Sequence, residues 1–485
     1  MRDEDARHAA PGLVQLGSAV TAVLDVIRSA GGRPFLVGGC VRDALLAPGR
    51  RPADVDIEVF GLDLDQVAAA LARVGRVDEV GRAFVVLKVR RDGEDLDVSV
   101  PRVVPSSGRA PVADPGASLS EAAHRRDFTV NALMYDPATE EVVDLVGGLA
   151  DLRDGVLRHT GPAFAEDPLR VLRGAQFAAR FGFRLAPETA ELCRSLLPAY
   201  DGLPRERVWG EWRKTAEKGR HLTAALAVLA ESGWLATVPQ LARLSGLPQD
   251  PRWHPEGDVL THSGLAADAA AALADDAGLT GNDRAVVVLG APLHDLGKAR
   301  YTQHRADGRI TSHGHAEGGV APVEELLTSI GAPSALIARI APVVREHMTA
   351  ITTGGRPSAA AVHRLARRLE PASISEWSLV CGADHAGRGA GSGPNPTTSW
   401  LEVAASAEVH QRPGRPLLRG SDLIARGIAP GPRFGPVMRA AIAAQDDGEF
   451  SDHAGAVAWL SRLEADGRLA RLLASARPTP DADRG

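Results

Sequence analysis

The feature that most constrains the fold is a change of pattern near residue 160. Before it, short apolar runs such as PFLVGG, ADVDIEVFG and FVVLKVR alternate with turns and short amphipathic stretches, which predicts an α+β domain. In this first part, the pattern of residues 13–29 predicts an amphipathic helix, and Asp92-Gly93 predicts a hairpin turn after FVVLKVR. Beyond residue 160, the pattern is almost wholly helical. A chain of 485 residues is longer than a single domain with one hydrophobic core usually is, so we expect three or four domains. We place them at residues 1–150 (head), 151–245 (neck), 259–390 (a second helical unit) and 400–475 (a C-terminal helical region). The Pro/Gly-rich segment 245–258 is expected to be a joint.

Composition excludes several classes of protein. The hydrophobic share of 44% is ordinary for a globular chain, and no apolar run approaches the ~18 residues of a membrane span. The charged opening MRDEDARHAAPG does not resemble a signal peptide. The three cysteines form no CxxC pair, which predicts neither a disulfide framework nor a cysteine-based zinc site. We therefore expect a cytoplasmic protein that binds no membrane. The net charge of −6 means that any RNA contact must come from local basic patches.

Two carboxylates, Asp54 and Asp56, lie two residues apart in a predicted strand, so both side chains should project from one face. Like charges so close are costly unless a cation lies between them, and Mg²⁺ prefers such oxygen ligands. Upstream, the Gly38-Gly39 turn lets backbone N–H groups approach a triphosphate, and Arg42 can clamp its oxygens. A lone Asp-x-Asp pair is usually a solvated turn. The glycine turn, Arg42 and the two carboxylates, occurring in this order, instead predict phosphoryl transfer by a 3′-hydroxyl with Mg²⁺.

Five motifs occur in order along the chain: FLVGGCVRDALL, DVD, HRRDFTVNAL (124–133), DLVGGLADL (144–152) and EDPLRVLRGAQFAARFGF (166–183). Together they resemble the class II CCA-adding tRNA nucleotidyltransferases and the bacterial poly(A) polymerases. The resemblance implies an α+β fold, in which a small polymerase-β-like nucleotidyltransferase sheet domain precedes mostly α-helical neck, HD and C-terminal domains.

The same resemblance implies roles for particular residues. Asp54 and Asp56 would hold the catalytic metals, and Asp97 would serve as a base or an extra ligand. Asp127 would touch the ribose of the nucleotide or support Arg126. The remaining nucleotide contacts would come from one glycine and four arginines, Gly39, Arg42, Arg126, Arg170 and Arg173.

The segment 166–183 carries a possible means of choosing a base without a template. Asp167 and Arg170 are spaced i, i+3, so both side chains should share a helical face. A carboxylate can accept from the exocyclic amine of cytosine or adenine while a guanidinium donates to the ring nitrogen. The alternative is structural, with Asp167 as a helix N-cap before Pro168. In the neck, Arg207 and Lys214 are expected to meet RNA phosphates, although a solvated amphipathic helix explains the same pattern.

A second set of residues, His262, His294-Asp295 and Asp384, occurs in the order H…HD…D on predicted helices. This order resembles the HD phosphohydrolase superfamily. Such ligands suit Ni²⁺, Mn²⁺, Zn²⁺ or Fe²⁺, and the metal would activate water against a phosphoester. Three further histidines are candidate ligands of a second metal or of phosphate: His313, His315 and His347. An ordinary role as surface or core histidines explains them equally well. HD domains fused to CCA-adding enzymes imply phosphatase or 2′,3′-cyclic phosphodiesterase action on damaged RNA ends.

The leading functional prediction is addition of CCA to tRNA 3′ ends from CTP and ATP. Its nearest rival, a poly(A) polymerase or A-adding enzyme, shares every head motif but tends to carry long basic extensions. The loop after Arg102, VVPSSGRAPVADPGASLSEAA, is short and poor in basic residues, and comparable loops help relatives switch between CTP and ATP. A third possibility is an HD phosphohydrolase with a non-catalytic RNA-binding head, against which the intact Asp54 and Asp56 speak.

Overall fold

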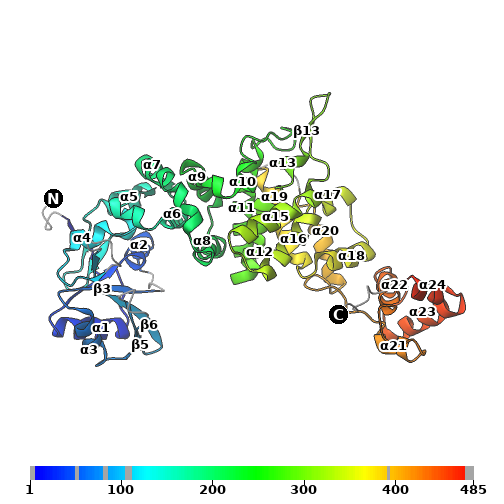
Figure 1. The fold of residues 1–485 in the computed structure, drawn as a ribbon, viewed down its shortest axis with the longest axis horizontal. Helices are drawn as coiled ribbons and strands as arrows, with labels where there is room; N and C mark the ends of the chain where they lie inside the picture. The colour runs from blue at the N-terminus through cyan, green and yellow to red at the C-terminus, as the bar shows by residue number, and fades with distance from the viewer. Residues whose placement is uncertain (1–5, 50–53, 80–85, 104–111, 390–393, 476–485) are drawn as a thin grey trace, which may run out of the picture. The chain divides into compact units, whose positions relative to one another are not determined.

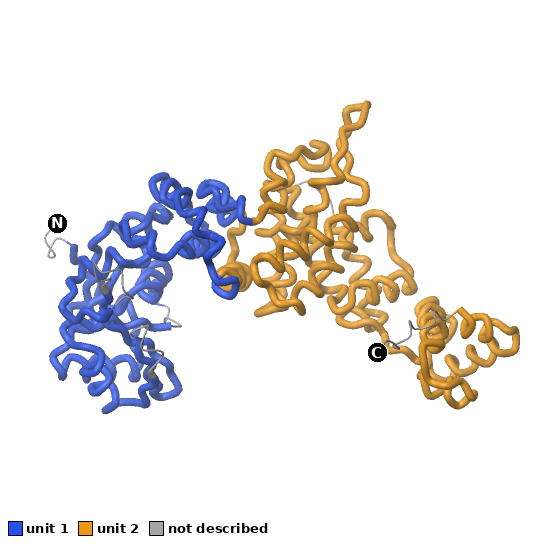
Figure 2. The backbone as a smooth tube through the Cα atoms, in the orientation of Figure 1, with its two compact units in different colours: residues 1–207, 224–237 blue, residues 208–223, 238–485 orange. Residues whose placement is uncertain are grey.

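The computed structural model describes residues 6–49, 54–79, 86–103, 112–389 and 394–475. The chain forms two compact units. Unit 1 comprises residues 1–207 and 224–237, and unit 2 comprises residues 208–223 and 238–485 (Figure 2). The predicted α+β fold with a small mixed sheet and a long helical remainder is confirmed. The finer division into four domains stays a prediction.

Unit 1 is built on a mixed sheet whose strand order is β1-β10-β9-β2-β3-β6-β5-β4 (Figure 1). Every neighbouring pair is antiparallel except β3 and β6, which run parallel. The strands of the sheet are β1 Arg7–Ala9, β2 Arg33–Val37, β3 Asp56–Phe60, β4 Arg76–Glu79, β5 Val86–Arg91, β6 Glu94–Ser99, β9 Met134–Asp136 and β10 Glu141–Val143. Two short pairs lie outside it, β7 Arg102–Val103 with β8 Val112–Ala113 and β11 Val156–Leu157 with β12 Arg184–Leu185.

The turn between β5 and β6 is the hairpin predicted from its Asp-Gly pair. Asp92 has φ 51° and Gly93 has φ 81°. Two residues with positive φ form the type I′ turn whose twist matches that of the flanking strands. This hairpin brings β6 back along β3, so Asp97 lies directly beside Asp56 in the parallel register.

Two predicted boundaries at the head were wrong. The first helix was expected over residues 13–29, but α1 begins at Ser18 after the extended Gly17. Strand β3 begins only at Asp56, so Asp54 precedes the strand instead of belonging to it. The reason is the partner strand. Val37, the last residue of β2, is opposite Asp56, and Gly38 then turns the chain away with φ 71°.

Helices cover the sheet of unit 1. The buried side of α1 carries Val20, Val23, Leu24 and Ile27, as its amphipathic pattern predicted. Helix α4 packs its alanines against Phe35 on β2. The helices with residues in this unit are α1 Ser18–Ser29, α2 Gly39–Leu46, α3 Leu64–Leu71, α4 Leu119–His124, α5 Gly148–Asp154, α6 Arg170–Phe181, α7 Pro187–Ser195, α8 Arg205–Lys218 and α9 Leu222–Glu231, with 3-10 turns at Thr129–Asn131, Pro162–Glu166, Leu197–Gly202 and Trp234–Thr237.

Unit 2 is helical apart from the short pair β13 Gln303–His304 and β14 Ile310–Thr311. Its centre is the packing of α11 against α19 and α12, and small residues permit the close approach. A Cβ at Gly387 would lie 2.9 Å from the backbone nitrogen of Ala266. The helices are α10 Pro239–Ala242, α11 Val259–Asp276, α12 Gly281–Leu293, α13 Lys298–Tyr301, α14 His315–Gly318, α15 Val320–Ser329, α16 Ser334–Glu346, α17 Thr349–Thr353, α18 Ala359–Leu369, α19 Ile374–Gly387 and α20 Thr398–Ser406.

The last helices of unit 2 have a hydrophobic cluster of their own. It includes the fully buried Leu423, Val437 and Leu460. A two-pronged ion pair between Arg367 on α18 and Asp446 on α22 ties this cluster to the preceding helices. Its helices are α21 Gly420–Ile424, α22 Phe434–Asp446, α23 His453–Ala465 and α24 Arg468–Ala474. Across the described ranges of both units, no helix is long and apolar enough to cross a membrane.

Candidate active sites

Three carboxylates lie close together at the start of β3 in unit 1. Asp56 opens the strand, Asp54 lies exposed in the bend before it, and Asp97 is the register partner of Asp56 on β6. Register partners on neighbouring strands project from the same face of a sheet. Two residues further along β3, Glu58 lies on this face as well. The sheet therefore gathers acidic side chains that are distant in the sequence.

The charge balance at Asp56 favours a cation. Partial loss of hydration raises the pKa of the Asp56 carboxyl although water still reaches the residue, and attraction by Arg126 opposes this. Repulsion from Asp97 and Asp54 adds to the rise in pKa. Oxygen ligands that repel one another in this way fit a hard divalent cation such as Mg²⁺.

A glycine turn lies against these carboxylates. Gly38 has φ 71° and ψ −127°, a conformation that side-chain-bearing residues rarely adopt. A Cβ there would lie 3.7 Å from Nη1 of Arg126 and 4.0 Å from Oδ2 of Asp56. Gly39 then begins α2. The turn thus lets a phosphate approach the protein backbone beside the acidic face.

Two of the predicted nucleotide-binding arginines are engaged inside the protein. Arg42 is buried, donates to Asp43 at 2.7 Å and to Asn131, and its guanidinium lies 4.5 Å from the ring centre of Phe181. Arg126 donates to Glu58 at 2.8 Å and keeps about a quarter of its side chain exposed. Of the two, Arg126 is the one that reaches the acidic face. Direct contact of either with a nucleotide stays a prediction.

Asp127 is buried and serves the internal structure. Its Oδ1 accepts from the backbone of Phe128 at 2.7 Å and from Asn131 at 2.9 Å, and its Oδ2 accepts from Arg173 at 2.9 Å. Burial alone would raise the pKa of Asp127, but Arg173 and these donors outweigh it and hold the pKa below its usual value. Asp127 therefore fixes Arg173 on α6, and its charge also helps to raise the pKa of Arg126. Its contact with the ribose of a nucleotide stays a prediction.

The two predicted base-selecting residues, Asp167 and Arg170, have different hydrogen-bond partners. Helix α6 begins at Arg170, so Asp167 lies before the helix, where its carboxylate accepts from the backbone of Leu169 at 3.3 Å. Its ion-pair partner is Arg207, at 2.8 Å. The Arg170 guanidinium donates to the carbonyl oxygens of Ala163 and Arg125, at 2.8 and 3.0 Å. Asp167 thus lies just before α6 and not on it, and its bond to Leu169 is of the kind expected from the alternative of a cap before Pro168. A base-reading role for the two residues stays a prediction.

In unit 2, the predicted RNA contact Lys214 donates to Glu211 at 2.8 Å on the same helix. Glu211 is buried, whereas the Lys214 side chain is 42% exposed. An exposed ammonium held by a buried carboxylate is available to a phosphate, and the role predicted for Lys214 stays a prediction.

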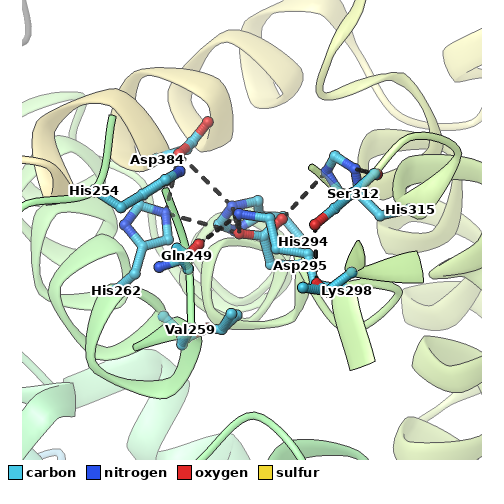
Figure 3. Close-up of polar contacts among 12 residues, drawn as sticks. Gln249, His254, Val259, His262, His294, Asp295, Lys298, Ser312, His315 and Asp384 are labelled. Atoms are coloured by element: carbon cyan, nitrogen blue, oxygen red, sulfur yellow. Dashed lines mark hydrogen bonds and ion pairs between the residues drawn. The ribbon is translucent and has the colours of Figure 1, made fainter. Parts of the chain in front are cut away.

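The second site collects His262 from α11, His294 and Asp295 from the end of α12, and Asp384 from α19 (Figure 3). All four are almost fully buried. Nε2 of His262 lies 3.0 Å from Oδ1 of Asp384, and Nε2 of His294 lies 3.1 Å from Oδ2 of Asp295 and 3.7 Å from Oδ1 of Asp384. The order H…HD…D is thus one cluster in space.

Two of the three further histidines join this cluster. Nε2 of His315 lies 3.3 Å from Oδ1 of Asp295, and Nε2 of His347 lies 3.1 Å from Nε2 of His315. Burial, then repulsion from His294 and His315, lowers the pKa of His347 to about 3, so its ring is neutral, as a metal ligand must be. His313 is exposed in the loop before α14.

The cluster fits a divalent metal. Neither carboxylate oxygen of Asp295 has a well-directed hydrogen bond, although Lys298 Nζ lies 2.7 Å from Oδ2. Burial would lower the pKa of His262, but Asp384, Glu256 and Asp295 raise it to about 9, because the carboxylates attract positive charge. The ligand atoms of His262, His294 and Asp384 lie within 4.8 Å of one another, as do those of His294, Asp295 and His347. Imidazole and carboxylate groups so placed suit a transition metal.

Sequence reasoning missed four residues beside this cluster. Gln249, His254 and Glu256 lie in the segment 245–258, which its prolines and glycines marked only as a joint. Lys298 begins α13 and is buried against Gln249, with Nζ 2.6 Å from Oε1. The LHDLGK run placed Lys298 one turn beyond Asp295, the one signal that could have indicated its role.

Comparison with known proteins decides the family. Residues 34–158 match the poly A polymerase head domain, and residues 259–384 match the HD domain. The chain is 36% identical over 423 residues to the multifunctional CCA protein of Xanthomonas campestris pv. campestris, covering 84% of this chain and 96% of that one. The chain belongs to the multifunctional CCA protein family. The resemblance drawn from the five motifs is thereby confirmed.

Solved structures extend the likeness in fold. The CCA-adding enzyme of Bacillus stearothermophilus in complex with CTP superposes with a TM-score of 0.63 at 22% identity, covering 93% of this chain and 99% of that one. The Thermotoga maritima CCA-adding enzyme complexed with tRNA_CCA gives 0.56 at 17% identity, covering 97% and 100%. Membership of the multifunctional CCA protein family and this shared fold place both sites described above in one enzyme lineage.

Proposed function

We propose that this protein adds C and A nucleotides to tRNA 3′ ends from CTP and ATP, and that its HD site hydrolyses phosphoesters at RNA ends. The chain is a nucleotidyltransferase by family. The observation that carries the first part is the parallel register that sets Asp97 beside Asp56, with Asp54 preceding the strand and the Gly38 turn facing them. Relatives of the same fold were solved with CTP and with tRNA_CCA.

In the head, Asp54, Asp56 and Asp97 would hold Mg²⁺. When bound, Mg²⁺ lowers the pKa of the attacking 3′-hydroxyl and neutralises the triphosphate. The turn at Gly38 admits the phosphates close to the backbone, and the N-terminus of α2 favours their negative charge. Arg126, held by Glu58, presents a guanidinium to the same face. The protein thus orients the two reactants and balances their charge.

Choice of base rests on Asp167 and Arg170. Before a nucleotide binds, Asp167 pairs with Arg207 and Arg170 donates to two carbonyl oxygens. The Arg207 side chain is 47% exposed, so its pair with Asp167 is worth about 0–1 kcal/mol and is cheaply exchanged for the amine of cytosine or adenine. Arg207 released in this way would be free for an RNA phosphate, as the sequence predicted.

At the HD site, His262, His294, Asp295 and Asp384 would hold a divalent metal, which we propose to be Ni²⁺, Mn²⁺, Zn²⁺ or Fe²⁺. A metal bound there would supply an activated water for attack on phosphorus. His347 and His315 extend the cluster on the far side of Asp295 and provide a second metal position or a phosphate contact. Lys298, fixed by Gln249, holds Asp295 in place.

Two alternatives are open to experiment. A poly(A) polymerase or A-adding enzyme would use the same head, and residues 104–111 of the loop expected to influence the switch lie outside the described residues. A non-catalytic RNA-binding head would not need the acidic face, which the intact Asp54, Asp56 and Asp97 argue against. The cytoplasm stays the predicted compartment, in keeping with three buried free thiols.

Incorporation of labelled CTP into tRNA lacking CCA tests the proposal. We expect Asp56→Asn to abolish incorporation and to retain hydrolysis at the HD site, whereas His262→Ala gives the opposite result. Glu376→Gln, which alters a buried carboxylate of unit 2 that accepts from Ser373 and pairs with Arg339, serves as the matched control and should retain both. Incorporation by Asp56→Asn at the unaltered rate would reject the head as the catalytic site.

A further inference from the structure

Glu256 lies beside Nδ1 of His262 and is not one of the four residues of the HD pattern. Its Oε1 is 2.7 Å from Nδ1 of His262 and 2.9 Å from Nδ1 of His254. The rings of His254 and His262 meet edge to face, with centres 4.7 Å apart. Only 8% of the Glu256 side chain and 11% of the His254 side chain are exposed. One carboxylate oxygen therefore serves two histidines in a nearly dry environment (Figure 3 shows His254 beside His262).

The two nitrogens of His262 face different partners. Nε2 points to the metal-ligand cluster, 3.0 Å from Asp384 and 3.9 Å from Asp295. A metal takes the lone pair of a neutral imidazole, so binding through Nε2 requires the proton on Nδ1. A proton on Nδ1 in a buried site needs an acceptor, and Glu256 is within reach although slightly off the ideal direction for a hydrogen bond.

We propose that Glu256 is a positioning residue of the HD metal site, which fixes the tautomer and orientation of His262, and that His254 in turn holds Glu256. This inference rests on the proposed function of the HD site. The same group of atoms could instead form a separate metal site, because His254, Glu256 and His262 also bring ligand atoms within 4.8 Å of one another. Since Nδ1 and Nε2 of His262 face opposite partners, the two readings predict different metal stoichiometries.

The test is titration of the metal-free full chain with Co²⁺, followed by affinity, stoichiometry and the visible absorption of the bound ion. Loss of an outer carboxylate partner of a metal-binding histidine lowers metal affinity by about 10–100-fold. We expect this loss in Glu256→Ala. A smaller loss is expected in Glu256→Gln, whose amide oxygen still accepts the Nδ1 proton. Glu376→Gln, whose side chain in the same unit is 9% exposed, close to the 8% of Glu256, should bind Co²⁺ like the unaltered protein.

The outcomes separate the possibilities. Unaltered Co²⁺ affinity and spectrum in Glu256→Ala would overturn the positioning role. The loss of one whole equivalent of bound Co²⁺, with the spectrum of the remaining ion unchanged, would also overturn it, because that result would mean a separate metal site. Equal losses in Glu256→Ala and Glu376→Gln would show a general effect on folding and would also overturn it. His262→Ala tests the underlying site, because unaltered Co²⁺ binding in that variant would reject the HD metal site itself.

Discussion

Replacing Arg173 by alanine should expose how strongly the head depends on one buried carboxylate. Asp127 is 8% exposed at its side chain, and Oδ2 receives its bond from Arg173 at 2.9 Å. In Arg173→Ala, the bonds from Phe128 and Asn131 to Oδ1 remain, while Oδ2 loses this donor. The variant therefore leaves a charged oxygen desolvated without its ion-pair partner.

The magnitude follows from this geometry. Loss of a hydrogen bond to a charged group costs roughly 1.5–3 kcal/mol, and more when the charge is left buried. The Arg173 side chain is 37% exposed, so water screens the pair and can approach the vacated space. We therefore expect a loss of about 1–2 kcal/mol in the local stability of α6, which corresponds to a factor of about 5–30 in the opening equilibrium.

The effect depends on pH in a defined direction. The folded pKa of Asp127 is lowered, because Arg173 and the other donors outweigh burial, so the ionised carboxylate contributes stability above its unfolded pKa, near 3.9. That contribution is lost as the pH falls through the folded pKa. In Arg173→Ala, burial meets less opposition and the folded pKa rises. The difference between the two proteins should therefore be largest near neutral pH and shrink below about pH 4.

Hydrogen–deuterium exchange of the peptide spanning α6, measured in the full chain, reports this local stability. Arg180→Ala is the matched control on the same helix, because Arg180 pairs with Asp43 and both side chains are about a third exposed, 32% and 35%. Exchange should accelerate by about 5–30-fold in Arg173→Ala and by less than threefold in Arg180→Ala. Equal acceleration in the two variants, or none in Arg173→Ala, would mean that the pair of Arg173 with Asp127 does not stabilise α6.

Three further predictions concern function. Gly38→Ala should reduce nucleotide incorporation by about 5–150-fold, because alanine at φ 71° and ψ −127° costs about 1–3 kcal/mol, and unaltered incorporation would contradict this. Asp167→Asn should reduce the preference for CTP over UTP by about 5–150-fold, measured as a ratio of kcat/KM, since the amide can donate as well as accept, and an unchanged ratio would reject the base-reading role. Removal of metal by EDTA should stop both activities. Mg²⁺ should then restore nucleotide incorporation, whereas hydrolysis at the HD site should need a transition metal. Recovery of both activities with Mg²⁺ alone would contradict the proposed metals.

Local patterns predicted much of the head, and long-range pairing explains what they missed. The β5–β6 hairpin followed from Asp92-Gly93, whose turn chemistry is local. The start of β3 at Asp56 did not, because it depends on where β2 ends and on the turn at Gly38. The position of Asp97 beside Asp56 likewise depends on register between strands that the chain connects through α3, β4 and β5.

The site residues show the same limit. His262, His294, Asp295 and Asp384 were predicted from their order, and the helices bring them together. Glu256 was missed because its segment has the composition of a linker, and only the fold carries that loop back to His262. The ion pair of Asp167 with Arg207 was also missed, because the folded chain brings α8 to Asp167 and the local spacing carries no signal of that contact.

The most direct test of the central claim uses tRNA transcripts that end before CCA, after C and after CC. Each is offered CTP alone, ATP alone or both with Mg²⁺, and the products are sized to one nucleotide. With both nucleotides, we expect each transcript to be extended to CCA and no further. CTP alone should extend only the transcripts that lack a C, and ATP alone should extend only the transcript that ends in CC. Long A tails, or A addition to the CC transcript alone, would contradict it and assign the chain to the poly(A) or A-adding branch.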